Sequence, residues 1–140
     1  SHATYARVSD DNIIITDATE TVLNGFSEDF DTGTYWASGN PERFTISTAG
    51  LYLIRCAVQD ISSTPDATLA WIKMQAFRNG STLGVDYRCE FIANDDNMLP
   101  YVQFLYYASA SDYFHFTLTQ DRADNGTHSY DNIVMEIVSL

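Results

Sequence analysis

The sequence has few basic residues and no long apolar run, and each shortage excludes a class of protein. Seven lysines and arginines, with Lys73 as the single lysine, stand against nineteen acidic residues, which gives a formal net charge of −12. Such a surface repels phosphate backbones and anionic lipids, so we expect neither nucleic acid nor a membrane as a partner. No apolar run approaches the roughly 20 residues of a membrane helix, and no signal peptide is visible.

Cysteine is also scarce. Cys56 and Cys89 are too few for a disulfide framework, although a single disulfide between them stays open. Both lie in apolar, strand-like runs, where a free cysteine behaves as a small core residue. We therefore expect two buried thiols, and the redox compartment stays undecided.

The residue patterns of catalytic sites are missing. The three histidines, His2, His115 and His128, are scattered, no serine lies in a Gly-x-Ser-x-Gly turn, and no glycine-rich phosphate loop is present. We therefore expect a protein that is not an enzyme.

No cofactor or metal is expected, although oxygen-rich stretches of the kind that bind Ca²⁺ occur. Solvated acidic loops are the simpler interpretation. The stretches are Asp10-Asp11, Glu28 with Asp29 and Asp31, Asp95 with Asp96, and Asp121 with Asp124.

What the sequence does have is a succession of short runs rich in Val, Ile, Thr, Tyr and Phe, separated by turn residues. This pattern is typical of a β-sandwich or barrel. We predict one all-β domain over residues 1–140, with 1–10 as a candidate N-terminal arm or linker. The predicted strands are 4–8, 12–16, 20–24, 34–37, 43–47, 50–59, 69–78, 82–91, 98–108, 113–120 and 131–139. Asn79-Gly80-Ser81 and Asn125-Gly126-Thr127 match the glycosylation acceptor pattern, but Asn-Gly is first of all a turn signal.

Alternation within the predicted strands leaves several of them with a second face that is half aromatic and half polar. In 50–59, Tyr52, Ile54 and Cys56 lie on a uniformly apolar face, whereas Leu53 lies beside Arg55 on the other. A monomer would expose such a mixed face to water, and a symmetric oligomer would bury it.

Four segments resemble the tumour necrosis factor superfamily, which includes the globular heads of the complement collagens. "FTISTAGLYLIRCAVQ" is similar to its strand, glycine turn and following aromatic, and Gly50 is expected to need a conformation or closeness that a β-carbon disfavours. "IKMQAFRNGSTL" resembles its middle hairpin, "YVQFLYYASASDYFHFTL" its pair of strands joined by a tight turn, and "NIVMEIVSL" its apolar last strand. The chain departs from the family at Ser111-Asp112, where Gly commonly precedes the Asp.

The resemblance implies a ten-stranded jelly roll, two sheets face to face, assembled as a three-fold homotrimer. Carried over by position, six residues would face the three-fold axis. These are Leu53, Arg55, Tyr101, Gln103, Leu105 and Leu140. The alternation places those of them that lie in strands on the mixed second face, which the core does not bury.

Within the superfamily, the sequence of these segments is most similar to the heads of bacteriophage virion proteins. Such heads are found at the tips of tail fibres, as head fibres or as capsid decoration. We therefore expect a trimeric virion module that binds a host-surface receptor or glycan, or the capsid. A secreted complement-type head that binds protein or carbohydrate is the alternative, and a glycan-active enzyme is the third reading.

In a trimeric jelly roll the sheets serve core and interface, which leaves loops and grooves for recognition. The candidate loops are 60–67, 93–98 and 121–131, where carboxylate, amide and aromatic groups suit a sugar or a basic surface. The candidate binding residues in them are Asp95, Asp96, Asp121, Asp124, Asn125, His128 and Tyr130.

Overall fold

The computed structural model describes residues 2–61, 70–91, 99–121 and 126–140. Over these residues it contains ten strands in two antiparallel sheets. The first sheet runs, in spatial order, through β3 (Ser27–Asp31), β1 (Tyr5–Ile15), β10 (His128–Ser139), β5 (Gly50–Ile61) and β8 (Tyr101–Ala108). The second runs through β2 (Thr21–Val22), β9 (Tyr113–Asp121), β6 (Ala70–Arg78) and β7 (Ser81–Phe91), with β4 (Arg43–Thr45) also paired to β9. The prediction of a two-sheet, ten-stranded sandwich is confirmed.

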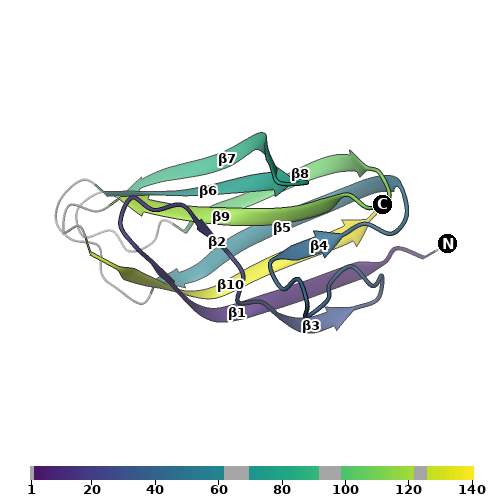
Figure 1. Ribbon diagram of the computed structural model, residues 1–140, viewed down its shortest axis with the longest axis horizontal. Helices are drawn as coiled ribbons and strands as arrows, with labels where there is room; N and C mark the ends of the chain where they lie inside the picture. The colour runs from purple at the N-terminus through teal and green to yellow at the C-terminus, as the bar shows by residue number, and fades with distance from the viewer. Residues whose placement is uncertain (1, 62–69, 92–98, 122–125) are drawn as a thin grey trace.

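The core lies between the two sheets, because strand alternation turns one apolar face of each sheet toward the other. Figure 1 shows the two layers and places both chain termini at the same end of the sandwich. The largest fully buried side chains include Tyr130 and three phenylalanines, Phe44, Phe114 and Phe116. Across the described part of the chain, no helix is long and apolar enough to span a bilayer.

The hairpin between β6 and β7 follows its turn residues. Asn79 and Gly80 have φ values of 51° and 80°, and the flanking Arg78 and Ser81 pair directly. Two successive positive φ values characterise the tight turn that suits the twist of antiparallel strands, and Asn-Gly is its preferred sequence. The turn interpretation of Asn79-Gly80 is confirmed.

Three predicted elements differ from the structure. The two predicted strands 4–8 and 12–16 are parts of one strand, β1 (Tyr5–Ile15), which pairs with both β10 and β3, so residues 5–10 of the candidate arm belong to the sheet. The predicted strand 34–37 is wrong, because these residues form no strand. The acidic segment expected to be a loop is the edge strand β3.

The expectation for Gly50 is also wrong. Gly50 has no positive φ, and a β-carbon added there would meet only the Tyr52 ring, at an ordinary 3.8 Å. The close approach occurs instead at Gly33, where an added β-carbon would lie 2.1 Å from the Tyr35 ring. Glycine is thus required at position 33 because the buried Tyr35 ring packs directly against the backbone there.

Candidate functional site: the outer face of the first sheet

The outer face is the surface of the first sheet turned away from the second. Strand register arranges its side chains in rows that cross the sheet. One row is apolar and consists of Tyr5, Val138, Leu53 and Leu105, each paired with the next. Leu105 is 59% exposed, and β8 is the edge strand of the sheet. This row therefore leads from the middle of the sheet to an edge that a neighbouring molecule can reach.

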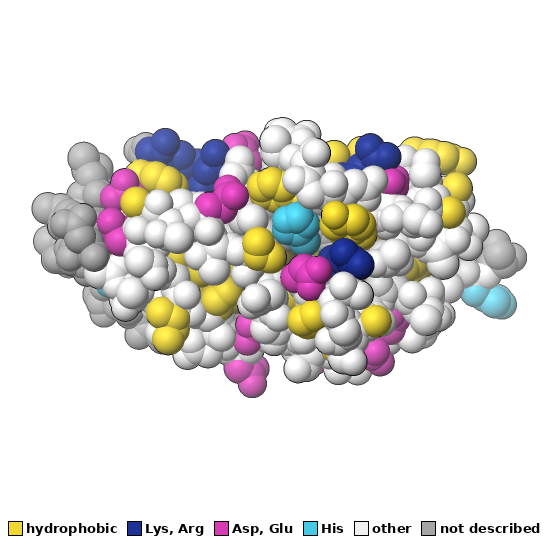
Figure 2. Space-filling view, in the orientation of Figure 1, with side chains coloured by type: hydrophobic (Ala, Val, Ile, Leu, Met, Phe, Trp, Pro, Cys, Tyr) yellow, Lys and Arg dark blue, Asp and Glu magenta, His cyan; other side chains and the backbone are white. Residues whose placement is uncertain are grey.

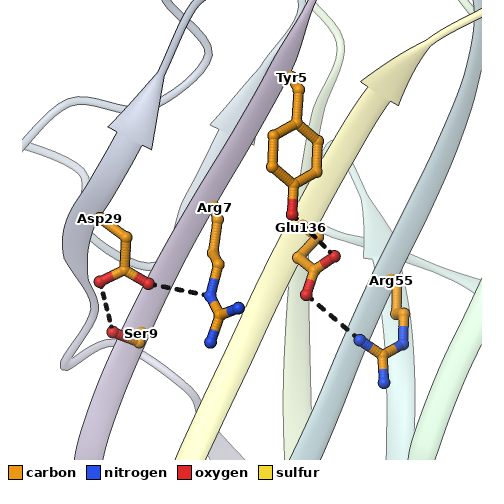
Figure 3. Close-up of polar contacts among 6 residues, drawn as sticks. All are labelled: Tyr5, Arg7, Ser9, Asp29, Arg55 and Glu136. Carbon is orange, nitrogen blue, oxygen red and sulfur yellow. Dashed lines mark hydrogen bonds and ion pairs between the residues drawn. The ribbon is translucent and has the colours of Figure 1, made fainter.

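The next row along the strands is charged. It consists of Arg7, Glu136, Arg55 and Gln103, again paired in succession. Arg55 Nη1 lies 3.2 Å from Glu136 Oε1, and the Tyr5 hydroxyl donates to Glu136 Oε2 at 3.0 Å (Figure 3). Burial and the hydrogen bond to this carboxylate raise the pKa of Tyr5, so the phenol stays protonated and remains a donor.

Arg7 is held by the neighbouring strand rather than by Glu136. Its Nε lies 3.0 Å from Asp29 Oδ2, and Ser9 Oγ donates to the other oxygen of Asp29 at 2.8 Å (Figure 3). Together with Asp29 of β3, the row combines two arginines with two carboxylates, and these charges balance. On a chain with a net charge of −12 this balance permits close approach of a second copy.

Exposed apolar side chains surround the charged row. They are Tyr101 at 54%, Tyr107 at 73%, Leu51 at 39% and Leu140 at 68% exposed, and Leu51 pairs with Tyr107. The backbone N–H of Leu140 donates to the Leu51 carbonyl at 2.9 Å, which brings the end of the chain to β5. Large exposed apolar groups gathered on one sheet face are a mark of an interaction surface.

The six axis-facing candidates lie together. Five belong to the paired positions of β5 and β8, and Leu140 adjoins β5 through Leu51. Their gathering is shown by the structure, whereas their role in a trimer stays a proposal. The candidate set omits Tyr107 and Leu51, which the same period-two alternation places on this face, and it omits Tyr5 and Glu136, which only the cross-strand register reveals.

The second sheet carries a different outer surface. His115 on β9 stacks on Phe77 of β6 with ring centroids 4.8 Å apart, and the Arg43 guanidinium lies 4.4 Å from the centre of the Tyr113 ring. Burial lowers the pKa of His115, against the opposing pull of Glu42 and Glu20. In the view of Figure 2 a histidine lies among hydrophobic side chains, with acidic and basic side chains beside it. His115 is thus a packed, neutral ring on a mixed surface.

Asp112 is the most heavily engaged carboxylate described. It is 4% exposed and lies 3.0 Å from Arg78 Nε, while Asn79 Nδ2 and the Ser109 backbone N–H donate to it at 2.8 and 2.9 Å. Desolvation raises its pKa, but the hydrogen bonds from Arg78, Asn79 and Ser109 outweigh this and hold the pKa below its ordinary value. Asp112 thereby ties the β8–β9 turn to the β6–β7 turn.

The structure describes only some of the candidate ligand-binding residues in the loops. Tyr130 is fully buried within β10, where it pairs with Ile13, so the prediction that it contacts a ligand is wrong. Asp121 ends β9 and His128 begins β10, and both are half-buried. The remaining candidates, Asp95, Asp96, Asp124 and Asn125, lie outside the described residues, as do all of the loop 93–98 and residues 62–67 of the loop 60–67.

Two residues of the acidic stretch 28–31 form bonds within the fold. Asp29 binds Arg7, and the two oxygens of Asp31 accept the backbone N–H groups of Gly33 and Trp36 at 2.9 and 2.8 Å. Within these ranges no group of three or more His, Cys, Asp or Glu side chains is placed to hold a metal ion.

Cys56 is a free, fully buried thiol, and burial strongly raises its pKa. This agrees with the expectation for Cys56. Cys89 pairs through its backbone with Ile72, and its side chain lies outside the described residues.

Comparison with solved structures identifies the fold. PRD1 vertex protein P5 matches 98% of this chain and 96% of its own with a TM-score of 0.68, at 14% sequence identity. Murine APRIL matches over 99% of this chain and 100% of its own (TM-score 0.57, 14% identity), and the globular domain of zebrafish complement 1qA over 96% and 94% (TM-score 0.58, 9% identity). The chain has the tumour necrosis factor-like jelly-roll fold. No protein-family model matches it, and no curated protein matches its sequence.

The tumour necrosis factor-like fold is the fold that the four sequence segments imply. It also gives the departure at Ser111 a physical meaning. Ser111 has a φ of 74°, a conformation that glycine adopts at little cost, which explains why glycine commonly stands there in the superfamily.

Proposed function

We propose that this chain is a homotrimeric, non-catalytic head module of a bacteriophage virion, which binds a host-surface receptor or glycan, or docks on the capsid. The observation that carries the proposal is the outer face, where exposed apolar side chains surround a charge-balanced row on an otherwise strongly acidic molecule. Fold similarity to PRD1 vertex protein P5 supports the virion setting.

The exposed edge of the outer face supports assembly with other copies. The edge strand β8 carries Tyr101, Leu105 and Tyr107 at its rim, and an exposed edge of this kind is avoided in an isolated domain. Placing this rim against the apolar row of a neighbouring copy covers both surfaces. Such a head-to-tail contact closes into a ring when its rotation is three-fold.

The charged row then serves to fix the register of the copies. Each of its arginines already has a carboxylate partner within the protomer, so burying the row leaves no uncompensated charge. The apolar rows supply the hydrophobic contribution to association, at about 25 cal/mol per Å² of buried surface.

A secreted complement-type head is the alternative, supported by the fold shared with the globular domain of complement 1qA. This alternative predicts the same homotrimer, but as a secreted protein and not as part of a virion. The two proposals differ only in whether the chain belongs to a particle.

Mass spectrometry and immunoelectron microscopy of purified phage particles test the proposal. For a phage that encodes this chain, we expect the chain in gradient-purified particles and antibody labelling at their surface. Recovery only as free protein, with particles that contain none of it, would contradict a virion role.

The same particles separate the two classes of partner. Docking on the capsid through the acidic surface should weaken as ionic strength rises, because screening shortens the reach of charge. Binding to neutral sugars on host cells should change little with salt. The trimer is therefore to be assayed against both targets at low and high salt.

A further inference from the structure

Both chain termini lie at the same end of the sandwich (Figure 1). A groove lined mainly by residues with hydroxyl groups lies at this end. Its volume is about 540 Å³, within the range of about 300–1,000 Å³ typical of small-molecule sites. It is bounded by the segment 32–35, by the segment 47–52 that leads into β5, and by the two chain ends. It is separate from the loops 121–131 and from the charged row of the outer face.

The side chains that line the groove include no acid, lysine or arginine and are rich in hydroxyls. None of its fourteen residues is Asp, Glu, Lys or Arg, in a chain in which 19% of residues are charged. Eight of the fourteen carry a hydroxyl group. A hydroxyl both donates and accepts hydrogen bonds, whereas binding of an ion calls for a fixed opposite charge.

The floor of the groove is held in place by its own hydrogen bonds. Thr4 Oγ1 contacts the Tyr35 hydroxyl and donates to Ser139 Oγ at 2.9 Å. The Tyr52 hydroxyl donates to the Thr48 carbonyl at 2.6 Å. Since Tyr35 and Tyr52 are each only 4% exposed, these bonds fix buried groups and pre-organise the site.

The rim, in contrast, offers free hydroxyls. Thr34, Ser47 and Thr48 are exposed, and among the described residues their side-chain hydroxyls have no protein hydrogen-bond partner. Thr34 is held at a φ of 58°, which is rare for a β-branched residue. Asp31 imposes this conformation by accepting the N–H groups of Gly33 and Trp36 on either side of it.

We propose that this groove binds a neutral, hydroxyl-rich ligand, namely the end of an uncharged oligosaccharide. The free hydroxyls of Thr34, Ser47 and Thr48 exchange hydrogen bonds with the sugar hydroxyls. Leu51 and Leu140, which also border the outer face, present apolar surface to the C–H face of the ring. The inference rests on the glycan-binding part of the proposed function and gives it a site, but it depends neither on the virion setting nor on three-fold assembly.

Titration of the full-length protein followed by amide NMR tests the inference. The probes are glucose, galactose, mannose and N-acetylglucosamine, with glucuronic acid and glucosamine as charged counterparts, at pH 8, where imidazole side chains are neutral. We expect at least one neutral sugar to bind with millimolar affinity and to shift the amide signals of residues 34 and 47–50. No shift with any neutral sugar at 50–100 mM, or tighter binding of a charged probe, would overturn the inference.

A pair of matched variants locates the site. Thr48→Val removes one rim hydroxyl at nearly constant shape and should weaken binding of that sugar at least about fivefold, the loss of one hydrogen bond. Thr16→Val makes the same change at an exposed position outside the groove and outside the candidate loops, and it should leave the affinity unchanged. Equal affinities of the two variants would overturn the assignment to this groove. A loss of folding in Thr48→Val is detected from its amide spectrum, and Ser47→Ala then replaces it under the same criterion.

Discussion

Asp112 shows how one side chain holds two turns that lie far apart in the sequence. Its carboxylate receives hydrogen bonds from Arg78 and Asn79 in the β6–β7 turn region and from the backbone of Ser109 before β9. The Asn79 side chain completes the link by accepting the Tyr113 N–H at 2.9 Å. The Asn79 side-chain amide thus stabilises the turn through both of its hydrogen bonds, in agreement with the turn interpretation of the Asn-Gly pair.

We expect Asp112→Asn to lower the free energy of unfolding by about 2 kcal/mol at pH 7, because hydrogen bonds to a charged group are lost. The pKa of Asp112 is lower in the folded than in the unfolded chain, so its contribution is complete above about pH 5. It is lost as the pH falls below about 4 toward the folded pKa. Urea unfolding at several pH values should therefore show the difference from wild type shrinking between pH 5 and pH 3.

Asp86→Asn is the control for this prediction. Asp86 Oδ2 lies 3.5 Å from Lys73 Nζ, but the carboxylate is 47% exposed. Exposed pairs of this kind contribute little, so the variant should stay within about 0.5 kcal/mol of wild type. Equal losses from the two variants would show that Asp112 is only another surface carboxylate.

At the scale of elements, the β8–β9 turn is strained at one position. Ser111 has a φ of 74°, while its N–H donates to Ile46 and the following Asp112 is anchored. A non-glycine residue in this region costs about 1–2 kcal/mol, and the greater freedom of glycine in the unfolded chain offsets about half of that.

Ser111→Gly should therefore raise the free energy of unfolding by about 0.5–1 kcal/mol, read as an increase in Tm by calorimetry. Ser109→Gly, in the same turn region but with no positive φ, should lower it. A Ser111→Gly variant less stable than wild type would mean that the turn is not strained in solution.

The sequence predicts the long strands well and the short edge elements poorly. Strands such as β5, β6, β8 and β9 show period-two alternation, which their burial reproduces. The failures at 27–31 and 34–37 have separate causes. β3 pairs only along the edge of β1, so its charged residues show no alternation. In 34–37, the Asp31 side chain accepts the Trp36 N–H, which a strand would use for pairing.

The candidate interface was predictable in part for the same reason. Alternation along β5 and β8 marks Leu53, Leu105 and their neighbours, because these residues lie in long strands. The contribution of Tyr5 and Glu136 was not predictable. It depends on β1 and β10 pairing at opposite ends of the chain, a long-range register that no local pattern contains.

At the scale of the whole molecule, charge and apolar surface are divided between faces. A net charge of −12 opposes self-association over most of the surface, whereas the outer face combines balanced charges with exposed Tyr101, Leu105 and Tyr107. The central claim is that three copies associate through this face.

Light scattering after size exclusion, at micromolar concentration, tests that claim most directly. We expect wild type to elute with three times the chain mass and to keep it on dilution, because obligate interfaces bury about 2,000–5,000 Å². Leu105→Asp, on the outer face, should lose this mass. Val22→Asp, which adds the same charge at an exposed apolar residue of the second sheet, should keep it. A wild-type protein that elutes with the mass of a single chain, or a Leu105→Asp variant that stays trimeric, would contradict the account.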